Sequence, residues 1–117
     1  MSVKKIPGEI AFEKEIHNFG TLKDGEVVAY SFKFRNKGGS PVKILKAEPS
    51  CGCIEVKFSE NEVLPGDSSF VTVIFNTSGE WGNQLKEARI ETSNGKSLEI
   101  QVGAYIDNKQ FNNLLNN

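Results

Sequence analysis

The sequence predicts an all-β protein, a β-sandwich of about seven short strands. Short runs alternate apolar and polar side chains, as strands with one buried face do. Turn residues such as Gly, Pro, Asn and Asp separate these runs. Eight phenylalanines, together with many Val and Ile residues, supply the bulky side chains that strands favour. No segment before the C-terminal tail has the spacing of an amphipathic helix.

The N-terminal third contains two expected strands. Residues 9–13 form the first, and the clearest alternation runs from Val27 to Asn36. Between them, His17-Asn18-Phe19-Gly20 predicts a bend and Asp24-Gly25 predicts a turn. One face of the second strand is expected to lie in the core, because it carries the large side chains of Val28, Tyr30, Phe32 and Phe34.

Three further strands are expected in the middle of the chain. A glycine-containing loop, 36–40, leads to a strand at 42–45, and the next strands are expected at 54–58 and 69–76. Leu64-Pro65-Gly66-Asp67 predicts a turn, because proline fixes its own φ and glycine accepts a positive φ.

The last strands are predicted to form a β-hairpin. Residues 88–92 and 98–102 alternate on either side of Asn94-Gly95, a pair favoured where both turn residues need positive φ.

The C-terminal tail is polar and rich in asparagine. Its apolar residues Phe111, Leu114 and Leu115 have helical spacing, which predicts one docked helical turn. The expected organisation is an N-terminal extension (1–8), one sandwich domain (9–106) and a C-terminal tail (107–117).

Composition and charge bound the partners that the chain is expected to bind. The 117 residues suit one domain, and the net charge is −1. In Lys33-Phe34-Arg35, alternation places the two charges on one face and Phe34 on the other, so nucleic acid binding is not expected. No run approaches the about 18 to 20 apolar residues of a membrane span, and residues 1–7 lack the apolar segment of a signal peptide.

The two cysteines, Cys51 and Cys53, flank Gly52 and form the strongest candidate thiol site. Their spacing is consistent with free thiols that pack as small apolar side chains at the start of a strand, with a disulfide, or with a thiolate pair for metal or redox chemistry. Free thiols are the favoured interpretation, and a disulfide comes second.

Strand geometry opposes a disulfide in this triplet. Residues i and i+2 of a regular strand lie about 6.5 to 7 Å apart, whereas a disulfide needs Cβ atoms about 3.5 to 4.5 Å apart. Closing the bond would require a bulge or a left-handed turn at Gly52, and the bond would be strained and easily reduced. It would also add little stability, about 1.6 kcal/mol for a three-residue loop.

No catalytic residue, metal site or cofactor is expected. Two thiolates suit Cu(I) or half of a zinc site, but tetrahedral zinc needs two further ligands, and the single histidine, His17, is distant in the sequence. His17 is expected at a strand end or in a loop, without a nucleophile motif beside it.

The single tryptophan, Trp81, follows the loop residues Thr77-Ser78-Gly79. Loops at the end of a sandwich carry binding residues, so an exposed Trp81 would be suited to stack on a sugar or contact a protein. The favoured interpretation is that Trp81 folds back and caps the end of the core.

An ordered set of short motifs spans about residues 9–106. It comprises Phe19-Gly20, Gly25-Glu26, residues 36–42, Ser50-Cys51-Gly52-Cys53, Leu64-Pro65-Gly66, Phe75-Asn76-Thr77 and Thr92-Ser93-Asn94. The set resembles a bacterial family of immunoglobulin-like domains of unknown function that carries a Ser-Cys-Gly-Cys motif, related to Hydin-like and major-sperm-protein-like sandwiches. The resemblance implies an immunoglobulin-like sandwich with Greek-key connections, placement in secreted or envelope proteins, and no established enzymatic activity.

These observations lead to one main functional hypothesis and two alternatives. The main hypothesis is a non-catalytic module that contacts protein partners through sheet edges or loop tips in a bacterial envelope or secreted protein. The first alternative is thiol redox chemistry or Cu(I) binding at Cys51 and Cys53. The second is glycan binding through Trp81.

Overall fold

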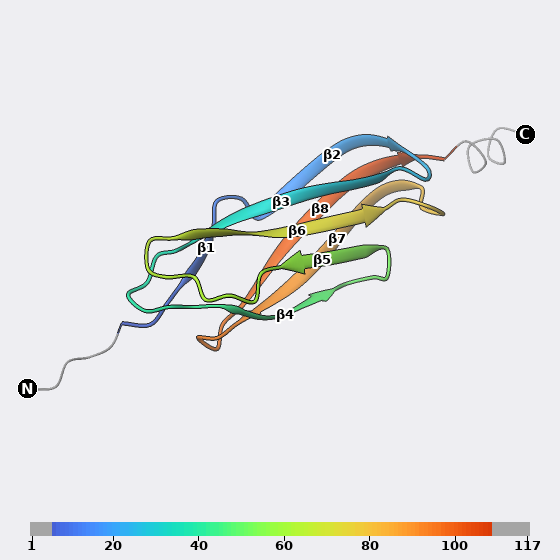
Figure 1. Ribbon diagram of the computed structural model, residues 1–117. Coiled ribbons are helices and arrows are strands. Elements are labelled where there is room, and N and C mark those ends of the chain that lie inside the picture. Colours follow the sequence, from blue (N-terminus) through green and yellow to red (C-terminus); the bar gives the residue numbers. More distant parts are fainter. Residues whose placement is uncertain (1–5, 109–117) are drawn as a thin grey trace, which may run out of the picture.

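The computed structural model describes residues 6–108, which form two β-sheets packed against each other (Figure 1). Each sheet has four strands. No helix within these residues has the length and apolar character needed to cross a membrane. In chain order the strands are β1 (Ile10–Phe12), β2 (Ile16–Lys23), β3 (Val27–Asn36), β4 (Ile44–Pro49), β5 (Ile54–Phe58), β6 (Ser68–Asn76), β7 (Gly82–Thr92) and β8 (Ser97–Asp107).

The strand orders match an immunoglobulin-type sandwich. The first sheet has the order β1-β3-β6-β5 and the second β2-β8-β7-β4. The first order corresponds to strands A, B, E and D of such domains, and β8-β7-β4 corresponds to G, F and C. The remaining strand, β2, lies beside β8 and runs parallel to it, whereas the other paired strands are antiparallel. The predicted all-β sandwich is confirmed.

Strand β2 was not predicted, so the described residues contain eight strands instead of about seven. Its inward side chains are His17, Phe19 and Leu22. These residues are first two and then three positions apart in the sequence. The change occurs because Gly20, with φ of +79°, lies in a bulge that shifts the register of β2 with β8. Interrupted alternation looks like a bend in the sequence, and the bend predicted at His17–Gly20 is wrong.

The strand expected at 42–45 is displaced along the chain. Strand β4 begins at Ile44 and continues to Pro49, while Val42 forms an isolated bridge with Val63. The register with β7 shifts between Ile44 and Lys46, so the alternation of the segment does not reveal where the strand ends.

The predicted hairpin is present, but its turn differs from the expected one. Strands β7 and β8 pair from Gly82, opposite Ile106, to Glu91, opposite Ser97, and the amide of Gly95 donates to the carbonyl of Thr92 (3.1 Å). Gly95 has φ of +83°, whereas no residue other than glycine has a positive φ between residues 6 and 108. Asn94 therefore does not adopt the positive φ expected of it. Instead, its side-chain amide donates to the carbonyl of Gly8 (2.8 Å).

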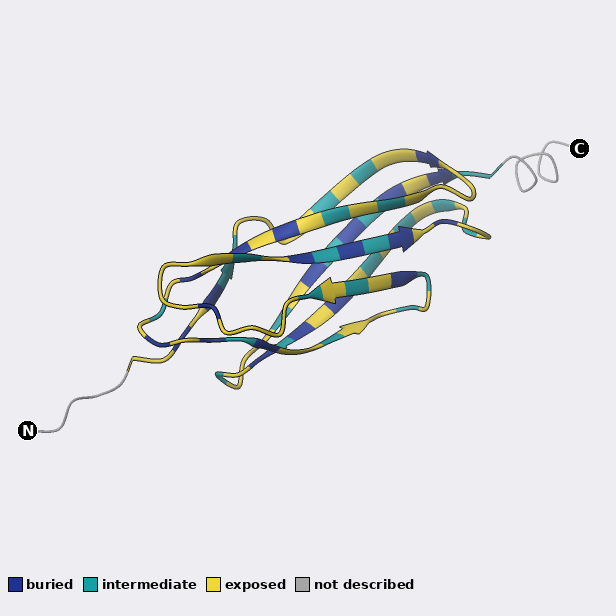
Figure 2. Ribbon diagram, viewed as in Figure 1, coloured by how far each residue is buried: buried dark blue, intermediate teal, exposed yellow. Residues whose placement is uncertain are grey.

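The core lies between the sheets and consists of the inward-facing residues of both. Exposure alternates along β3, where Phe32 and Phe34 are buried and Lys33 between them is exposed (Figure 2). Burial of each large apolar side chain contributes about 1.5 to 3 kcal/mol. The largest buried apolar side chains are those of Phe32, Phe34, Phe75, Ile90, Ile100 and Ile106.

Three connections meet at one end of the sandwich: the β2–β3 turn, the β4–β5 turn and the β6–β7 loop (Figure 1). The amide of Gly79 donates to the carboxylate of Asp24 (2.8 Å), and the buried hydroxyl of Thr77 donates to the carbonyl of Glu26 (2.7 Å). These bonds join the β6–β7 loop to the β2–β3 turn. The end that carries the cysteines is therefore ordered by contacts between loops.

Candidate functional site

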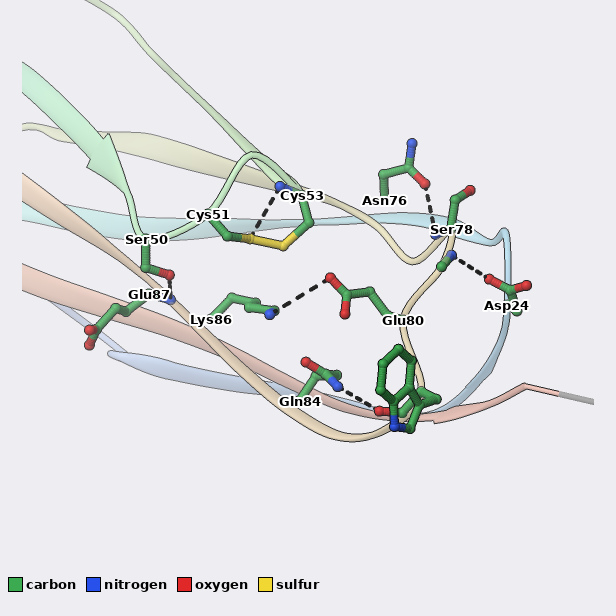
Figure 3. Close-up of polar contacts among 12 residues, drawn as sticks. Asp24, Ser50, Cys51, Cys53, Asn76, Ser78, Glu80, Gln84, Lys86 and Glu87 are labelled. Carbon is green, nitrogen blue, oxygen red and sulfur yellow. Dashed lines mark hydrogen bonds and ion pairs between the residues drawn. A yellow bond between two sulfur atoms is a disulfide. The ribbon is translucent and has the colours of Figure 1, made fainter. Parts of the chain in front are cut away.

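The two cysteines form a disulfide in the turn between β4 and β5 (Figure 3). The amide of Ile54 donates to the carbonyl of Cys51 (3.4 Å), which closes a β-turn around Gly52 and Cys53. The Cα atoms of Cys51 and Cys53 are 5.3 Å apart, closer than strand neighbours on one face. The favoured interpretation of free thiols at the start of a strand is wrong, because the cysteines lie in a turn that precedes β5.

Gly52 does not have the conformation that the disulfide was expected to need. Its φ is not among the positive glycine angles. A Cβ atom added to Gly52 would meet no atom within 4 Å. The turn as a whole, and not a left-handed glycine or a strand bulge, brings the two sulfurs together.

Neighbouring strands hold the turn on both sides. The amide of Ser50 donates to the carbonyl of Glu87 (2.8 Å), and the hydroxyl of Ser50 accepts the amide of Glu87 (3.0 Å). On the other side, the carbonyl of Cys53 accepts the amide of Asn76 (2.9 Å). The turn therefore links β7 of one sheet to β6 of the other.

A cation lies on the inner face of β7 beside the disulfide. Because Ser50 is bonded to Glu87, the same antiparallel register places Lys86 opposite Cys51. The side chain of Lys86 is only 18% exposed, and its ammonium group lies 3.8 Å from the carboxylate of Glu80 (Figure 3). Cys51 packs against the core from the same interior side.

The sulfur of Cys51 also accepts a hydrogen bond from within the turn. The amide of Cys53 donates to the sulfur of Cys51 (3.1 Å), and a hydrogen bond of this kind stabilises a negative sulfur. Both cysteine residues are half-buried.

The structure gives no support for a larger metal site. Within residues 6–108, no group of three or more His, Cys, Asp and Glu side chains is arranged to hold a metal ion. In the disulfide both sulfurs are bonded to each other, so Cu(I) would require prior reduction.

Trp81 does not cap the core as expected. Its side chain is 49% exposed and lies outside the group of partly buried hydrophobic residues that pack against the core. Its carbonyl accepts the side-chain amide of Gln84. Trp81, in the β6–β7 loop, lies at the same end of the sandwich as the β4–β5 turn that carries the disulfide (Figure 1).

His17 is the second residue of β2 and so lies close to a strand end, as expected, where it pairs with Val102 of β8. Its ring stacks on that of Tyr30, with centroids 3.7 Å apart and planes inclined by 6°. Phe19 contacts the imidazole edge-on at 4.7 Å. Burial lowers the pKa of His17, and the positive charge of Lys14 lowers this pKa further. The single histidine is therefore a packing residue that joins β2 to β3.

Residues 10–105 match the model of a family described as protein of unknown function, DUF1573. The chain belongs to this family. The match covers the sandwich as a whole, and it does not support the expectation that a Ser-Cys-Gly-Cys run marks the family. No curated protein matches the chain.

Solved structures of similar fold include proteins of very different sizes. A protein of unknown function from Porphyromonas gingivalis W83 has a TM-score of 0.73 and 18% identity, over 84% of this chain and 46% of that one. The secreted serine protease VesC from Vibrio cholerae has a TM-score of 0.63 and 13% identity, over 83% and 23%. PapD-like domain 7 of human CEP192 has a TM-score of 0.66 and 13% identity, over 85% of each chain.

These similarities establish an immunoglobulin-like or PapD-like sandwich. The chain spans less than half the length of the first structures that it matches. Sandwiches of this type occur as parts of larger proteins, including CEP192 and two proteases of which this chain covers 31% and 23%.

Proposed function

We propose that this chain is a non-catalytic module that binds a protein partner in the bacterial envelope or outside the cell, by addition of a partner strand to β5. The observation that carries the proposal is the position of β5 at the end of the order β1-β3-β6-β5. Within the described residues no strand lies beyond it, so one row of its backbone groups faces outward.

The register identifies those backbone groups. The amide of Asn76 donates to the carbonyl of Cys53, and alternate residues of β5 therefore direct their amides and carbonyls towards β6. Val56 and Phe58 lie between these positions, so their backbone groups face the open edge. The side chains of both residues are only half-buried, although they pack against the core. A strand added at this edge would hydrogen-bond to β5 and cover both side chains.

Two observations support a location outside the cytoplasm. Cys51 and Cys53 form a disulfide, and disulfides persist in oxidising compartments and are rare in the cytosol. Similar sandwiches occur in a secreted protease and in the S-layer protein SbsC. Both agree with the location that the family resemblance implies.

The experiment is site-specific photo-crosslinking in the native cells. A photo-reactive amino acid at Lys57, on β5, is expected to capture one protein partner, while the same group at Ser31, on the central strand β3, captures none. Val56→Pro removes an outward amide that the fold does not use, and proline is tolerated on edge strands. We expect this variant to fold and to lose the crosslink. Retention of the crosslink in folded Val56→Pro would contradict strand addition.

The disulfide supports a second candidate function, thiol–disulfide exchange with a protein dithiol. A thiolate of the dithiol attacks the sulfur of Cys53, and the electron pair of the broken bond leaves on Cys51. The second thiol of the partner then resolves the mixed disulfide. The partner is oxidised to a disulfide, and this chain receives two electrons and two protons as the Cys51–Cys53 dithiol.

The direction of attack gives this candidate a sharp test. The Cys53 amide favours negative charge on Cys51, and the strand register places Lys86 opposite Cys51, so we expect Cys51 to be the better leaving group. The single thiol in Cys53→Ser is expected to react with iodoacetamide at neutral pH, and Lys86→Gln in that variant is expected to slow the reaction. Lys57→Gln, at an exposed lysine, serves as the control. A thiol that stays unreactive in the native protein, or a rate indifferent to Lys86, would refute the proposed chemistry.

A further inference from the structure

The outer face of the second sheet contains a shallow hollow of about 370 Å³. This volume is within the range of ligand pockets, near its lower limit. The floor of the hollow is Gly103 on β8, where the absence of a side chain leaves space between the flanking strands β2 and β7. The hollow is on the opposite sheet from β5, so it is separate from the proposed protein-binding edge.

The first row across the hollow has a hydrophobic and a polar wall. Gly103 pairs with Asn18 on β2 and with Leu85 on β7. Leu85 is 62% exposed, so its side chain presents an apolar surface beside the glycine. The carbonyl oxygen of the Asn18 side chain accepts the amide of Gly20 (2.8 Å), which fixes this side chain and leaves its NH2 group for a ligand.

The second row provides an aromatic ring between two polar side chains. Tyr105 pairs with Thr21 on β2 and with Asn83 on β7, and its side chain is 45% exposed. The bulge in β2 falls between the two rows, where the register with β8 shifts. An exposed tyrosine has an apolar ring and a hydroxyl that donates and accepts hydrogen bonds.

We propose that this hollow binds a neutral saccharide. None of the residues that line it carries a charge at neutral pH. The C–H face of a sugar ring packs on Tyr105 and Leu85, while its hydroxyl groups, each a donor and an acceptor, match the amides of Asn18 and Asn83 and the hydroxyl of Thr21. Gly103 allows the ring to approach the backbone.

The charges around the hollow also favour a neutral ligand. At one end of the hollow, Glu87 on β7 is the register neighbour of Gln101 on β8. At the other end, Lys23 on β2 is the register neighbour of Asp107 on β8. The acidic and basic side chains thus border the site without giving it one sign of charge, so an acidic saccharide gains no general electrostatic attraction.

The test uses the full chain and three uncharged probes, cellohexaose, maltohexaose and fully N-acetylated chitohexaose, at millimolar concentrations. Amide chemical shifts in the NMR spectrum are expected to change with at least one probe, within residues 18–21, 83–85 and 103–105. Tyr105→Ala is expected to weaken binding about tenfold, which corresponds to about 1.4 kcal/mol. Phe70→Ala removes an exposed aromatic side chain from the other sheet and is the matched control.

A second variant blocks the hollow without removing a contact. A Cβ at Gly103 would lie 3.5 Å from the carbonyl oxygen of Gln84, an ordinary contact, and valine is favoured in strands, so Gly103→Val is expected to fold and to lose binding. The absence of shifts at the hollow with all three probes would overturn the proposal. So would binding that survives both Tyr105→Ala and Gly103→Val, or that Phe70→Ala weakens equally.

Discussion

The side-chain amide of Asn36 donates to the main-chain carbonyl of Val63, with nitrogen and oxygen 2.9 Å apart. The same side-chain nitrogen of Asn36 also donates to the carbonyl of Ser40 (2.8 Å). The side-chain oxygen of Asn36 accepts the backbone amides of Glu9 (3.0 Å) and Gly38 (2.9 Å). The side chain is fully buried. Asn36 thus joins the N-terminal segment, the β3–β4 loop and the β5–β6 loop with one amide group.

Replacing Asn36 with alanine is expected to destabilise the protein strongly. Two buried carbonyls and two amides would each lose a hydrogen bond, although the carbonyl of Val63 keeps the amide of Val42 as a donor. We expect the free energy of unfolding to fall by about 2 to 4 kcal/mol. Urea denaturation measures the change. Asn61→Ala, at an exposed loop residue, is the control and should change stability by less than about 0.5 kcal/mol. A loss as small as that of the control would show that water replaces the Asn36 contacts.

The sequence predicts Asn36 as the last residue of a strand but not its role. Two of the four partners, Glu9 and Val63, each lie 27 residues away from Asn36 in the sequence, and no local pattern records these contacts. By contrast, the alternation from Val27 to Asn36 depends on one buried face, so this strand has the expected bounds. Strand β2 was missed because the bulge at Gly20 interrupts the same alternation.

The candidate site shows the same limit. Cys51 and Cys53 are evident from composition, but their bonding depends on a turn whose ends are held by Glu87 and Asn76. The sequence gives the spacing of the cysteines and not the conformation between them. The hollow at Gly103 was also missed, because its walls come from three strands and its floor lies beyond the predicted end of the last strand at residue 102.

Two glycines in turns are expected to respond differently to substitution. Gly66 has φ of +85° in the Leu64–Asp67 turn, so Gly66→Ala is expected to cost about 1 to 2 kcal/mol. Gly52 has neither a positive φ nor a close neighbour, and Gly52→Ala is expected to change stability by less than about 0.5 kcal/mol. Urea denaturation compares the two. A larger loss for Gly52→Ala would contradict the turn conformation described for the cysteines.

Loss of the disulfide is expected to leave the sandwich folded. The bond closes a loop of only three residues. By restricting the unfolded chain it therefore adds at most about 1.6 kcal/mol to the free energy of unfolding. The turn also keeps its hydrogen bonds to Glu87 and Asn76. The variant with both Cys51→Ser and Cys53→Ser should therefore keep the dispersed NMR spectrum of the wild type, with shifts near the turn. A spectrum of an unfolded chain would show that the bond is essential for the fold.

Protonation of His17 is expected to destabilise the fold. Burial and the charge of Lys14 lower the pKa of His17, so the folded protein favours the neutral ring, whose partners are the aromatic rings of Tyr30 and Phe19. Its Nδ1 atom is buried and has no hydrogen-bond partner within residues 6–108, so an added proton gains no acceptor there. The associated stability is complete above the unfolded pKa of about 6.5 and is lost as pH falls through the lower pKa of the folded protein.

Urea denaturation at several pH values between about 7.5 and 5.5, the range in which histidine titrates, measures this effect. The wild type is expected to lose stability towards the acidic end, whereas His17→Phe, which keeps an aromatic ring between Tyr30 and Phe19, should lose less. In the wild type, Lys14→Gln is expected to raise the pKa of His17, because it removes the nearby positive charge, and an NMR titration of the single histidine reports this directly. Equal pH dependence in wild type and His17→Phe would show that other groups dominate this range.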